Sequence, residues 1–364
     1  MRFSLGSFAP VVVLALGSAN TLPPRALVAR TPTRTPASRE WTIARDPFVD
    51  LWFHSLAVVG YDGYGPLGLY DTRYAERVRG AKGRTHLTTT LDRRASELRR
   101  SLAADSAFEV LHFLPLYFVG QDPSLVLSAL RSTVHETRPA LRAGALASAA
   151  SAIAAALPTQ DERDVLVSLL DAVDDEWTTF YRAERASHEL DTRRTVRVLQ
   201  SAWDDRFAGA LDGYLGAMGM TRGTILISPA VGPEGRIVHE AGGATIVAVS
   251  SDASAGENAA ALRAVRELAF PLLDRLHAPL VASTSRVAAS RARDAAAVRA
   301  GAIILDVTDA SLAAEYRRLF LDAIGGRSFD SAYPISNEAA TELRRLATSA
   351  AAGAASGRAS YENK

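Results

Sequence analysis

The chain has 364 residues, of which 48% are hydrophobic, and its formal net charge is +1. It contains no cysteine, which excludes disulfides, lipid attachment to cysteine and a zinc site with Cys ligands. The near-neutral charge and the absence of a long Lys/Arg run argue against binding to nucleic acid. We expect one large hydrophobic core, or two that are closely packed.

Residues 1–19 have the features of a secretory signal peptide. Arg2 gives a positive start, residues 8–16 form a short apolar segment, and residues 17–19 form a small-residue cleavage site. The apolar segment contains Pro10 and is shorter than the roughly 20 residues that a membrane-spanning helix needs. We therefore expect an exported protein, periplasmic or extracellular, whose mature form is soluble and has no membrane span.

Residues 20–46 are rich in Pro, Thr and Arg, a composition that predicts a disordered leader. From Pro47 onward, large apolar residues take near-helical spacing, and we expect residues 47–220 to form a helical N-terminal subdomain. The clearest helix start is Thr159 with Glu162 three residues later. This is the capping-box spacing, in which each side chain satisfies a free backbone N–H.

After residue 220 the pattern changes from helical to strand-like. Three short β-rich runs separated by Gly-rich turns, at residues 224–228, 236–240 and 245–250, predict an antiparallel meander. Helices are expected to follow up to residue 352, and residues 353–364 to form a flexible tail. The predicted fold class is α+β, predominantly helical, with a small antiparallel sheet before the helical remainder of a C-terminal subdomain, residues 221–352.

The helix expected after the third strand contains the sequence Val-Arg-Glu-Leu-Ala-Phe at residues 265–270. This order of elements resembles gluzincin-type zinc peptidases, in which such a helix carries His-Glu-x-x-His, two histidines that bind zinc and a Glu that polarises water. Aligned on that motif, Glu267 matches the catalytic Glu, whereas Arg266 and Phe270 replace the histidines. A guanidinium and a phenyl ring have no lone pair to donate to a metal ion. We therefore expect no zinc at this helix and no other cofactor.

The third zinc ligand of that family is an acidic residue on a following helix. The segment 293–301 is similar to that region, and Asp294 is its only carboxylate. We hypothesise that Arg266 or Arg299 points into the former metal position and pairs with Glu267, which would neutralise a buried carboxylate. The alternative is an ordinary amphipathic helix, whose residues Val265, Leu268 and Leu272 serve the core.

Other candidate sites have simple structural explanations. His54 and His112 lie in apolar segments and are expected to be core histidines with satisfied hydrogen bonds, whereas His188 and His239 are expected at the surface. The Tyr- and Gly-rich segment 61–70 is either a binding loop or a turn packed on the core. Neither a Gly-x-Ser-x-Gly elbow nor a phosphate-binding loop is present.

Three functions remain open at this point. The resemblance favours an exported zincin-like protein that is inactive as a zinc peptidase and binds a peptide or protein in the inherited groove, by pairing with the edge strand. The second is an active, peptidase-like hydrolase with a non-standard site around Glu267. The third is a non-enzymatic helical scaffold in the cell envelope.

Overall fold

The computed structural model describes residues 40–62, 66–134, 144–239, 243–252, 254, 256–277, 280, 286–325 and 328–362. The predicted signal peptide and most of the predicted leader lie outside these residues. From residue 39 onward, the contacts of the chain group into a single unit.

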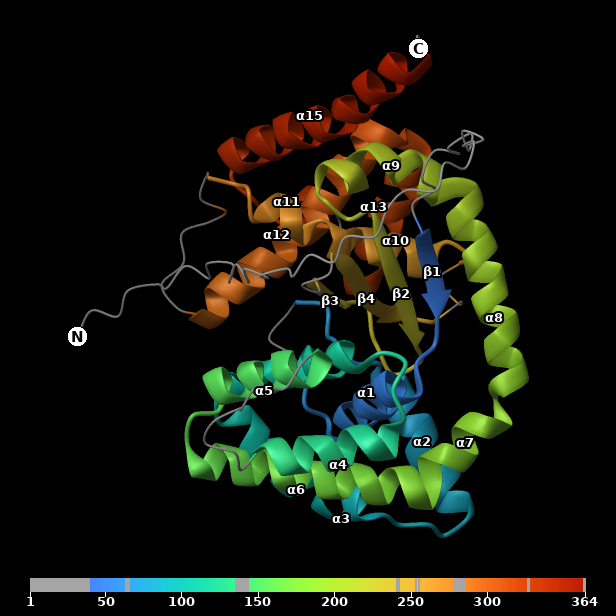
Figure 1. Cartoon of the computed structure of the whole chain (residues 1–364), viewed down its shortest axis with the longest axis vertical. Helices are drawn as coiled ribbons and strands as arrows, with labels where there is room; N and C mark the ends of the chain where they lie inside the picture. Colours follow the sequence, from blue (N-terminus) through green and yellow to red (C-terminus); the bar gives the residue numbers. More distant parts are fainter. Residues whose placement is uncertain are drawn as a thin grey trace, which may run out of the picture. The chain divides into compact units, whose positions relative to one another are not determined.

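Helices form most of this unit (Figure 1). The first half of the chain contains α1 (Pro47–Val59), α2 (Thr72–Arg84), α3 (Thr90–Ala103), the 3-10 helices η1 (Ser106–His112) and η2 (Leu114–Phe118), α4 (Pro123–Val134), α5 (Ala145–Ala156) and α6 (Gln160–Glu176). The capping box predicted from Thr159 and Glu162 starts α6. Helix α6 continues through the π-helical turn η3 (Trp177–Tyr181) into α7 (Arg182–Ser187).

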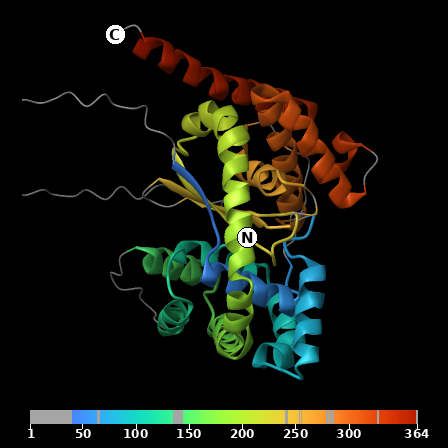
Figure 2. The same ribbon diagram turned by 90° about the vertical axis from the view of Figure 1, so that its right-hand side faces the viewer.

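The next helices lead to the sheet and beyond it. They are α8 (Glu189–Ala202), the π-helical turn η4 (Trp203–Phe207), α9 (Ala208–Ala217), α10 (Ala259–Leu268), α11 (Phe270–Leu273), α12 (Arg286–Thr308), α13 (Ala310–Ile324), α14 (Phe329–Ala332) and α15 (Asn337–Glu362). Helix α8 contacts β1 and runs along the sheet from the lower helices to the upper ones (Figure 2).

The described residues contain one four-stranded sheet, in the order β1-β2-β4-β3. Its strands are β1 (Glu40–Ala44), β2 (Arg222–Ser228), β3 (Arg236–His239) and β4 (Ala244–Ser250). Strands β1, β2 and β4 are parallel, and β3 runs antiparallel to β4. Strand β3 therefore forms one edge of the sheet, and its direction is opposite to that of the other three strands.

Both faces of the sheet are buried, each against a separate core. Leu226 and Ala248 belong to a core with the side chains of α1 to α6, whereas Ile225 and Val247 belong to a core with those of α9 to α15. In Figure 1 these two groups of helices lie below and above the sheet. Burial on both faces explains why β4 is apolar at successive positions instead of alternating.

The prediction of a mostly helical α+β fold is confirmed, but the sheet is mixed and not an antiparallel meander. The segment β3–β4 is the predicted hairpin, whereas β4 lies parallel to β2 because it enters the sheet between β2 and β3. Residues 40–44 were expected in the disordered leader and instead form β1. This strand is stabilised by pairing with β2 and by burial of Trp41 and Ile43 in the upper core.

Two further boundaries differ from the predicted ones. The division expected at residue 220 does not match the packing, because α9 contacts α15 and Leu211 and Tyr214 belong to the upper core. The flexible tail expected at residues 353–364 begins inside α15, which extends to Glu362. The high helix propensity of alanine explains why this Ala-rich segment stays helical.

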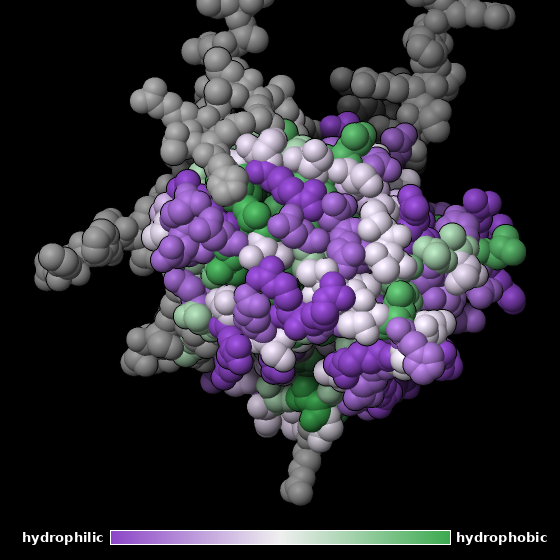
Figure 3. Space-filling view, turned by 90° about the horizontal axis from the view of Figure 1, so that it is seen from below, coloured by the Kyte–Doolittle hydropathy of each residue, from purple (hydrophilic) through white to green (hydrophobic). Residues whose placement is uncertain are grey.

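None of the helices among the described residues is both long enough and apolar enough to cross a membrane. The face seen from below in Figure 3 carries mostly hydrophilic side chains, and its hydrophobic residues appear as separate spots.

Candidate functional site

Helix α10 lies between β4 and α12, and all ten of its residues are buried. Three of these residues, Arg263, Arg266 and Glu267, carry charged side chains. Burying a charge is costly unless it is paired and hydrogen-bonded, so the partners of these side chains indicate what the helix is built to hold.

Arg266 and Glu267 form a buried ion pair, and their side chains are 0% and 1% exposed. The second terminal nitrogen of Arg266, Nη2, donates to Asp294 Oδ1 on α12 at 3.1 Å. Glu267 Oε1 also accepts the backbone N–H of Gly235, immediately before β3, at 3.0 Å. Of the two cations considered in the hypothesis, Arg266 is the one that pairs with Glu267.

Arg299, the other cation considered for this role, does not reach Glu267. It pairs with Asp330 and lies over the ring of Phe329, 5.7 Å from the ring centroid. Arg299 lies more than one helical turn after Asp294 on α12, so its side chain points toward α14 and not toward α10.

The two residues that replace the motif's histidines contact each other. The guanidinium of Arg266 lies 5.5 Å from the centroid of the Phe270 ring, and Arg293 approaches the same ring at 5.6 Å. Such cation–π contacts contribute about 0.5–2 kcal/mol, more when the cation is desolvated. Positions 266 and 270 thus share one face, although the helix is interrupted at Ala269.

Two more buried charges adjoin this group. Glu234 is fully buried, and Arg236 Nη1 lies 3.7 Å from its carboxylate and donates to the carbonyl of Gly235 at 2.7 Å. Hereafter the Arg266 cluster denotes Glu234, Arg236, Arg266, Glu267 and Asp294. It contains three carboxylates and two guanidiniums.

The pKa shifts in the Arg266 cluster reflect this imbalance. Burial raises the pKa of Glu267, and the charges of Arg266 and Arg236 offset only part of the effect. Burial also raises the pKa of Asp294. Burial disfavours the charged form of Arg266, but the negative charges of the surrounding carboxylates outweigh this effect and raise its pKa. The side chain is therefore permanently cationic.

A cavity of about 650 Å³ opens beside the Arg266 cluster. That volume is typical of a ligand site. The residues that line it come from η1, β3, α10, α11 and α12, and include Glu109, Val110, Phe113, Arg236, Ile237, His239, Glu267, Phe270, Arg293 and Asp294. Burial raises the pKa of Glu109 to about 7 against the opposing effect of Arg236. The cavity therefore has an apolar wall and a polar floor that includes a carboxyl group able to change charge near neutral pH.

A metal ion would compete with Arg266 for the carboxylates of this floor. Within the described ranges, no group of three or more His, Asp or Glu side chains is placed to hold one. At the motif position itself, a permanently charged guanidinium takes up the carboxylates that a metal ion would need.

The predicted burial of the histidines is confirmed, but His112 does not have all its hydrogen bonds satisfied as expected. His54 is fully buried, with Nε2 2.7 Å from Glu176 and Nδ1 2.8 Å from the Tyr74 hydroxyl. His112 is also buried; its Nδ1 lies 2.9 Å from the Tyr70 hydroxyl, whereas its Nε2 has no hydrogen-bond partner. His188 and His239 are exposed, but His239 ends β3 and lines the cavity.

Segment 61–70 packs on the core at both ends. Tyr61 stacks on His112 with 4.9 Å between ring centroids, and Leu69 is fully buried. Residues 63–65, in the middle of the segment, lie outside the described residues, and the binding-loop alternative falls partly on them.

Sequence reasoning missed a second buried group of charges. Lys82 Nζ lies 2.8 Å from Glu176 and 2.8 Å from Asp92, and it also donates to the Thr89 hydroxyl. We call His54, Lys82, Thr89, Asp92 and Glu176 the Lys82 cluster. One signal was present in the sequence: Lys82 is a lysine in a chain whose other positive residues, except Lys364, are arginines.

Sequence reasoning also missed a cavity at the carboxyl ends of the parallel strands, which is lined by residues of α2, α7 and α8. Comparisons with known proteins add no further constraint, since no protein-family model, curated protein or solved structure matches this chain.

Proposed function

We propose that this chain is a zincin-like protein that is inactive as a zinc peptidase and binds an extended peptide or protein segment along β3. The observation that carries the proposal is the position of β3. It is an edge strand, it runs against the other strands, and its residues line the cavity next to the Arg266 cluster.

The geometry of β3 supports strand pairing as the mode of binding. Within the described part of the chain β3 pairs with β4 alone, so the backbone groups of its outer edge are available to an added strand. An added strand would place alternate side chains toward the cavity. There Phe113 and Val110 offer apolar contacts, and Glu109 and Arg293 offer charges of both signs.

The Arg266 cluster supports the loss of peptidase activity. In the resembling family, the Glu at the position of Glu267 acts on a metal-bound water. Here Glu267 Oε1 is occupied by two donors, Arg266 and the Gly235 N–H. Removing either donor would leave a buried carboxylate less compensated, so the pair is better suited to hold the cavity floor than to move protons.

Peptide selection against the purified full chain tests the binding proposal. We expect selected peptides to share an alternating pattern. Two methylated versions of a selected peptide are compared, one with N-methyl groups at the odd positions and one at the even positions. One version should bind about tenfold or more weakly and the other should lose much less, because only alternate N–H groups of an added strand face β3. Equal effects in both versions, or no selected peptide, would contradict strand pairing.

A matched pair of substitutions locates the site. His239→Asp on β3 places a charge at the cavity, whereas Thr42→Asp places the same charge on β1, the other edge of the sheet. Both residues are exposed. Binding of the selected peptide should change with His239→Asp and remain within about twofold with Thr42→Asp, as for a surface change away from the site.

Restoring the histidines tests the zincin-like geometry separately. The double variant Arg266→His/Phe270→His would place two imidazoles on the face that holds Asp294, which already lies within bonding distance of residue 266. We expect the folded double variant to retain about one zinc ion per chain, and each single variant to retain much less, because structural and catalytic sites need three or four protein ligands. A folded double variant without zinc would argue against the resemblance.

A hydrolase that uses Glu267 is the second candidate, favoured by its raised pKa and its position at the cavity. Loss of a peptidase activity in Glu267→Gln, with the variant folded, would support it over the binding proposal.

We also propose export, on the basis of residues 1–19. Mass spectrometry of the chain recovered from a secreting host should give an N-terminus close to residue 20, as cleavage after a small-residue site predicts. An intact N-terminus on cytosolic protein would contradict export.

A further inference from the structure

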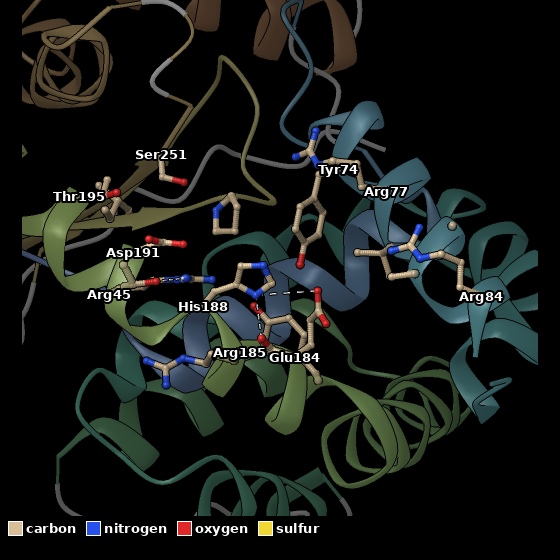
Figure 4. Close-up of a pocket in the computed structure, with 17 residues that line it drawn as sticks. Arg45, Tyr74, Arg77, Arg84, Glu184, Arg185, His188, Asp191, Thr195 and Ser251 are labelled. Carbon is tan, nitrogen blue, oxygen red and sulfur yellow. Dashed lines mark hydrogen bonds and ion pairs between the residues drawn. The ribbon is translucent and has the colours of Figure 1, made fainter. Parts of the chain in front are cut away.

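A second cavity, also of about 650 Å³, lies at the carboxyl ends of the three parallel strands, where Arg45 follows β1, Pro229 follows β2 and Ser251 follows β4. The remaining walls come from α2, from η3 and the end of α7, and from the start of α8 (Figure 4). None of its lining residues is shared with the cavity beside β3. In sheets of parallel strands, this edge is where small ligands bind.

Four arginines line this cavity from two sides. Arg77 and Arg84 project from α2, and Arg45 and Arg185 approach from β1 and α7 (Figure 4). The two on the β1 side are fixed by Asp50, which is 1% exposed: Arg45 Nε donates to its Oδ2, and Arg185 Nε lies 4.0 Å from the same atom.

Carboxylates lie close to three of these guanidiniums, those of Arg45, Arg77 and Arg185. The lining contains two carboxylates, Glu184 and Asp191, and Asp50 lies beneath. The Nε atom of Arg185 is buried and makes no hydrogen bond, whereas its Nη1 lies 3.8 Å from Oε2 of Glu189. The nearest carboxylate of Arg77 is 3.6 Å away on Asp71, and that arginine is 62% exposed.

Arg84 has even less compensation. It is exposed, and among the described residues it forms no ion pair. Arg84 and the largely exposed Arg77 are therefore the guanidiniums of this cavity that are most available to an anion.

The rest of the lining suits the organic part of a ligand. Val78, Ile227 and the ring of Tyr74 provide apolar surface, and Thr195 and Ser251 provide hydroxyl groups. Tyr74 is held in place by the hydrogen bond between its hydroxyl and His54 Nδ1, at 2.8 Å. Apolar and aromatic walls with a few polar groups are typical of small-molecule sites, and here they would suit a ligand with a charged end and an uncharged body.

We propose that this cavity binds a small organic anion whose phosphoryl or carboxylate groups contact Arg77 and Arg84, with Arg45 and Arg185, each beside a carboxylate, at the floor of the cavity. Planar guanidinium groups form paired hydrogen bonds to both kinds of oxyanion, which is why both belong to one ligand class. The site is independent of the peptide-binding proposal, because it lies on different elements and uses different residues.

Calorimetric titration of the full chain at low ionic strength tests this proposal, with pyrophosphate and citrate as probes. We expect at least one probe to bind, and we expect Arg77→Gln/Arg84→Gln to weaken that binding about tenfold or more, because two charge-assisted contacts are lost. Arg79→Gln is the matched control. It removes an exposed arginine of the same helix that does not line the cavity, and it should change binding by less than about twofold.

Comparison of the probes separates the two sources of negative charge. Tighter binding of pyrophosphate identifies a phosphoryl ligand, and tighter binding of citrate identifies a carboxylate ligand. The single variants Arg77→Gln and Arg84→Gln should each give an intermediate loss, and circular dichroism should show that all variants are folded, because both side chains are exposed. No binding of either probe at millimolar concentration, or equal losses in the double variant and Arg79→Gln, would overturn the proposal.

Discussion

Glu176 and Glu267 are both buried carboxylates with cationic partners, but their surroundings differ. Glu176 lies within the helical layer and contacts His54, Lys82 and Thr89. Burial opposes its charge, but the hydrogen bond from His54 and the nearby positive charge outweigh it and lower its pKa. Glu267 lies at the floor of a cavity, and there burial prevails and raises its pKa.

The protonation state of His54 completes the description of the surroundings of Glu176. Burial lowers its pKa, despite the adjacent carboxylate, so the ring is neutral near neutral pH. Because the Glu176 carboxylate can only accept, we assign the proton to Nε2, and Nδ1 accepts from the Tyr74 hydroxyl. Each polar atom of the ring is thus used within the core.

The difference separates a structural cluster from a candidate functional one. A lowered pKa means that the fold stabilises the carboxylate better than water does, which is the property of a structural ion pair. A raised pKa means that the fold tolerates a charge that it does not fully compensate, and in a cavity this is typical of a functional site. We therefore expect substitutions in the Lys82 cluster to affect stability most, and those around Glu267 to affect pH dependence and binding.

The largest expected effect is that of Lys82→Met. It leaves Glu176 and Asp92 without their cation, and breaking a buried ion pair costs about 3–5 kcal/mol of unfolding free energy. Chemical denaturation measures it. Arg84→Met, an exposed residue on the same helix, is the control and should stay within about 0.5 kcal/mol. Similar losses in both variants would mean that the Lys82 cluster is not the structural centre inferred here.

Gly235→Ala should have the next largest effect. A Cβ at this position would lie 2.5 Å from the carbonyl oxygen of Ala248 and 2.8 Å from Cγ of Glu267. Relieving that overlap should cost about 2 kcal/mol of unfolding free energy. Gly209→Ala is the control: its Cβ would meet nothing within 4 Å and it lies inside α9, so a gain of about 0.5–1 kcal/mol is expected. Unchanged stability of Gly235→Ala would show that β3 and α10 are less closely packed than described.

Glu109 should give the stability a distinctive pH dependence. Its pKa is about 7 in the fold, chiefly because of burial, against about 4.3 in the unfolded chain. Between these values the folded state binds a proton that the unfolded state does not, so this contribution to stability is present at low pH and lost as pH rises to about 7. From pH 5 to 7, the wild type should lose about 2 kcal/mol more than Glu109→Gln.

Glu176 should act in the opposite direction, since its pKa is lowered in the fold. Its stabilisation is present above the unfolded value of about 4.3 and is lost as pH falls below it. Denaturation of wild type and Glu109→Gln across this range separates the two contributions. Parallel curves for the two proteins above pH 5 would show that Glu109 titrates normally.

The smallest expected effect is the difference between two separate Asp→Asn variants, one in the Lys82 cluster and one in the Arg266 cluster. Asp92 has a lowered pKa: burial opposes the charge, but hydrogen bonds from Lys82 and Thr89 outweigh it. Asp92→Asn should therefore cost about 1–2 kcal/mol. Asp294 has a pKa that burial raises, so a neutral amide there should change stability by less than about 1 kcal/mol. The reverse order of the two losses would contradict the comparison.

The features that were predictable from the sequence depend on neighbours along the chain. The capping box of Thr159 and Glu162 is a local arrangement, and it starts α6 as expected. The pairing of Arg266 with Glu267 was hypothesised from the resemblance to the zinc motif, with Arg299 as the alternative cation, and the structure contains the Arg266 pair. Both inferences needed no knowledge of distant contacts.

The features that were missed depend on residues far apart in the sequence. Strand β1 follows a Pro- and Arg-rich segment, and only its pairing with β2 and the burial of Trp41 make it a strand. The parallel pairing of β2 with β4 was hidden by the short connections, which are typical of hairpins. The arginine-lined cavity needs α2 and α7 side by side, although Arg77 and Arg185 lie far apart along the chain.

The pairing of β1 with β2 has a consequence for how the protein is made. Thr42 and its partner Thr224 are separated by 182 positions, so the first strand leaves the ribosome long before the strand that completes it. Until then, Trp41 and Ile43 have no core to enter. Contacts of such long range slow folding, and the sheet should close only when more than half of the chain has been synthesised.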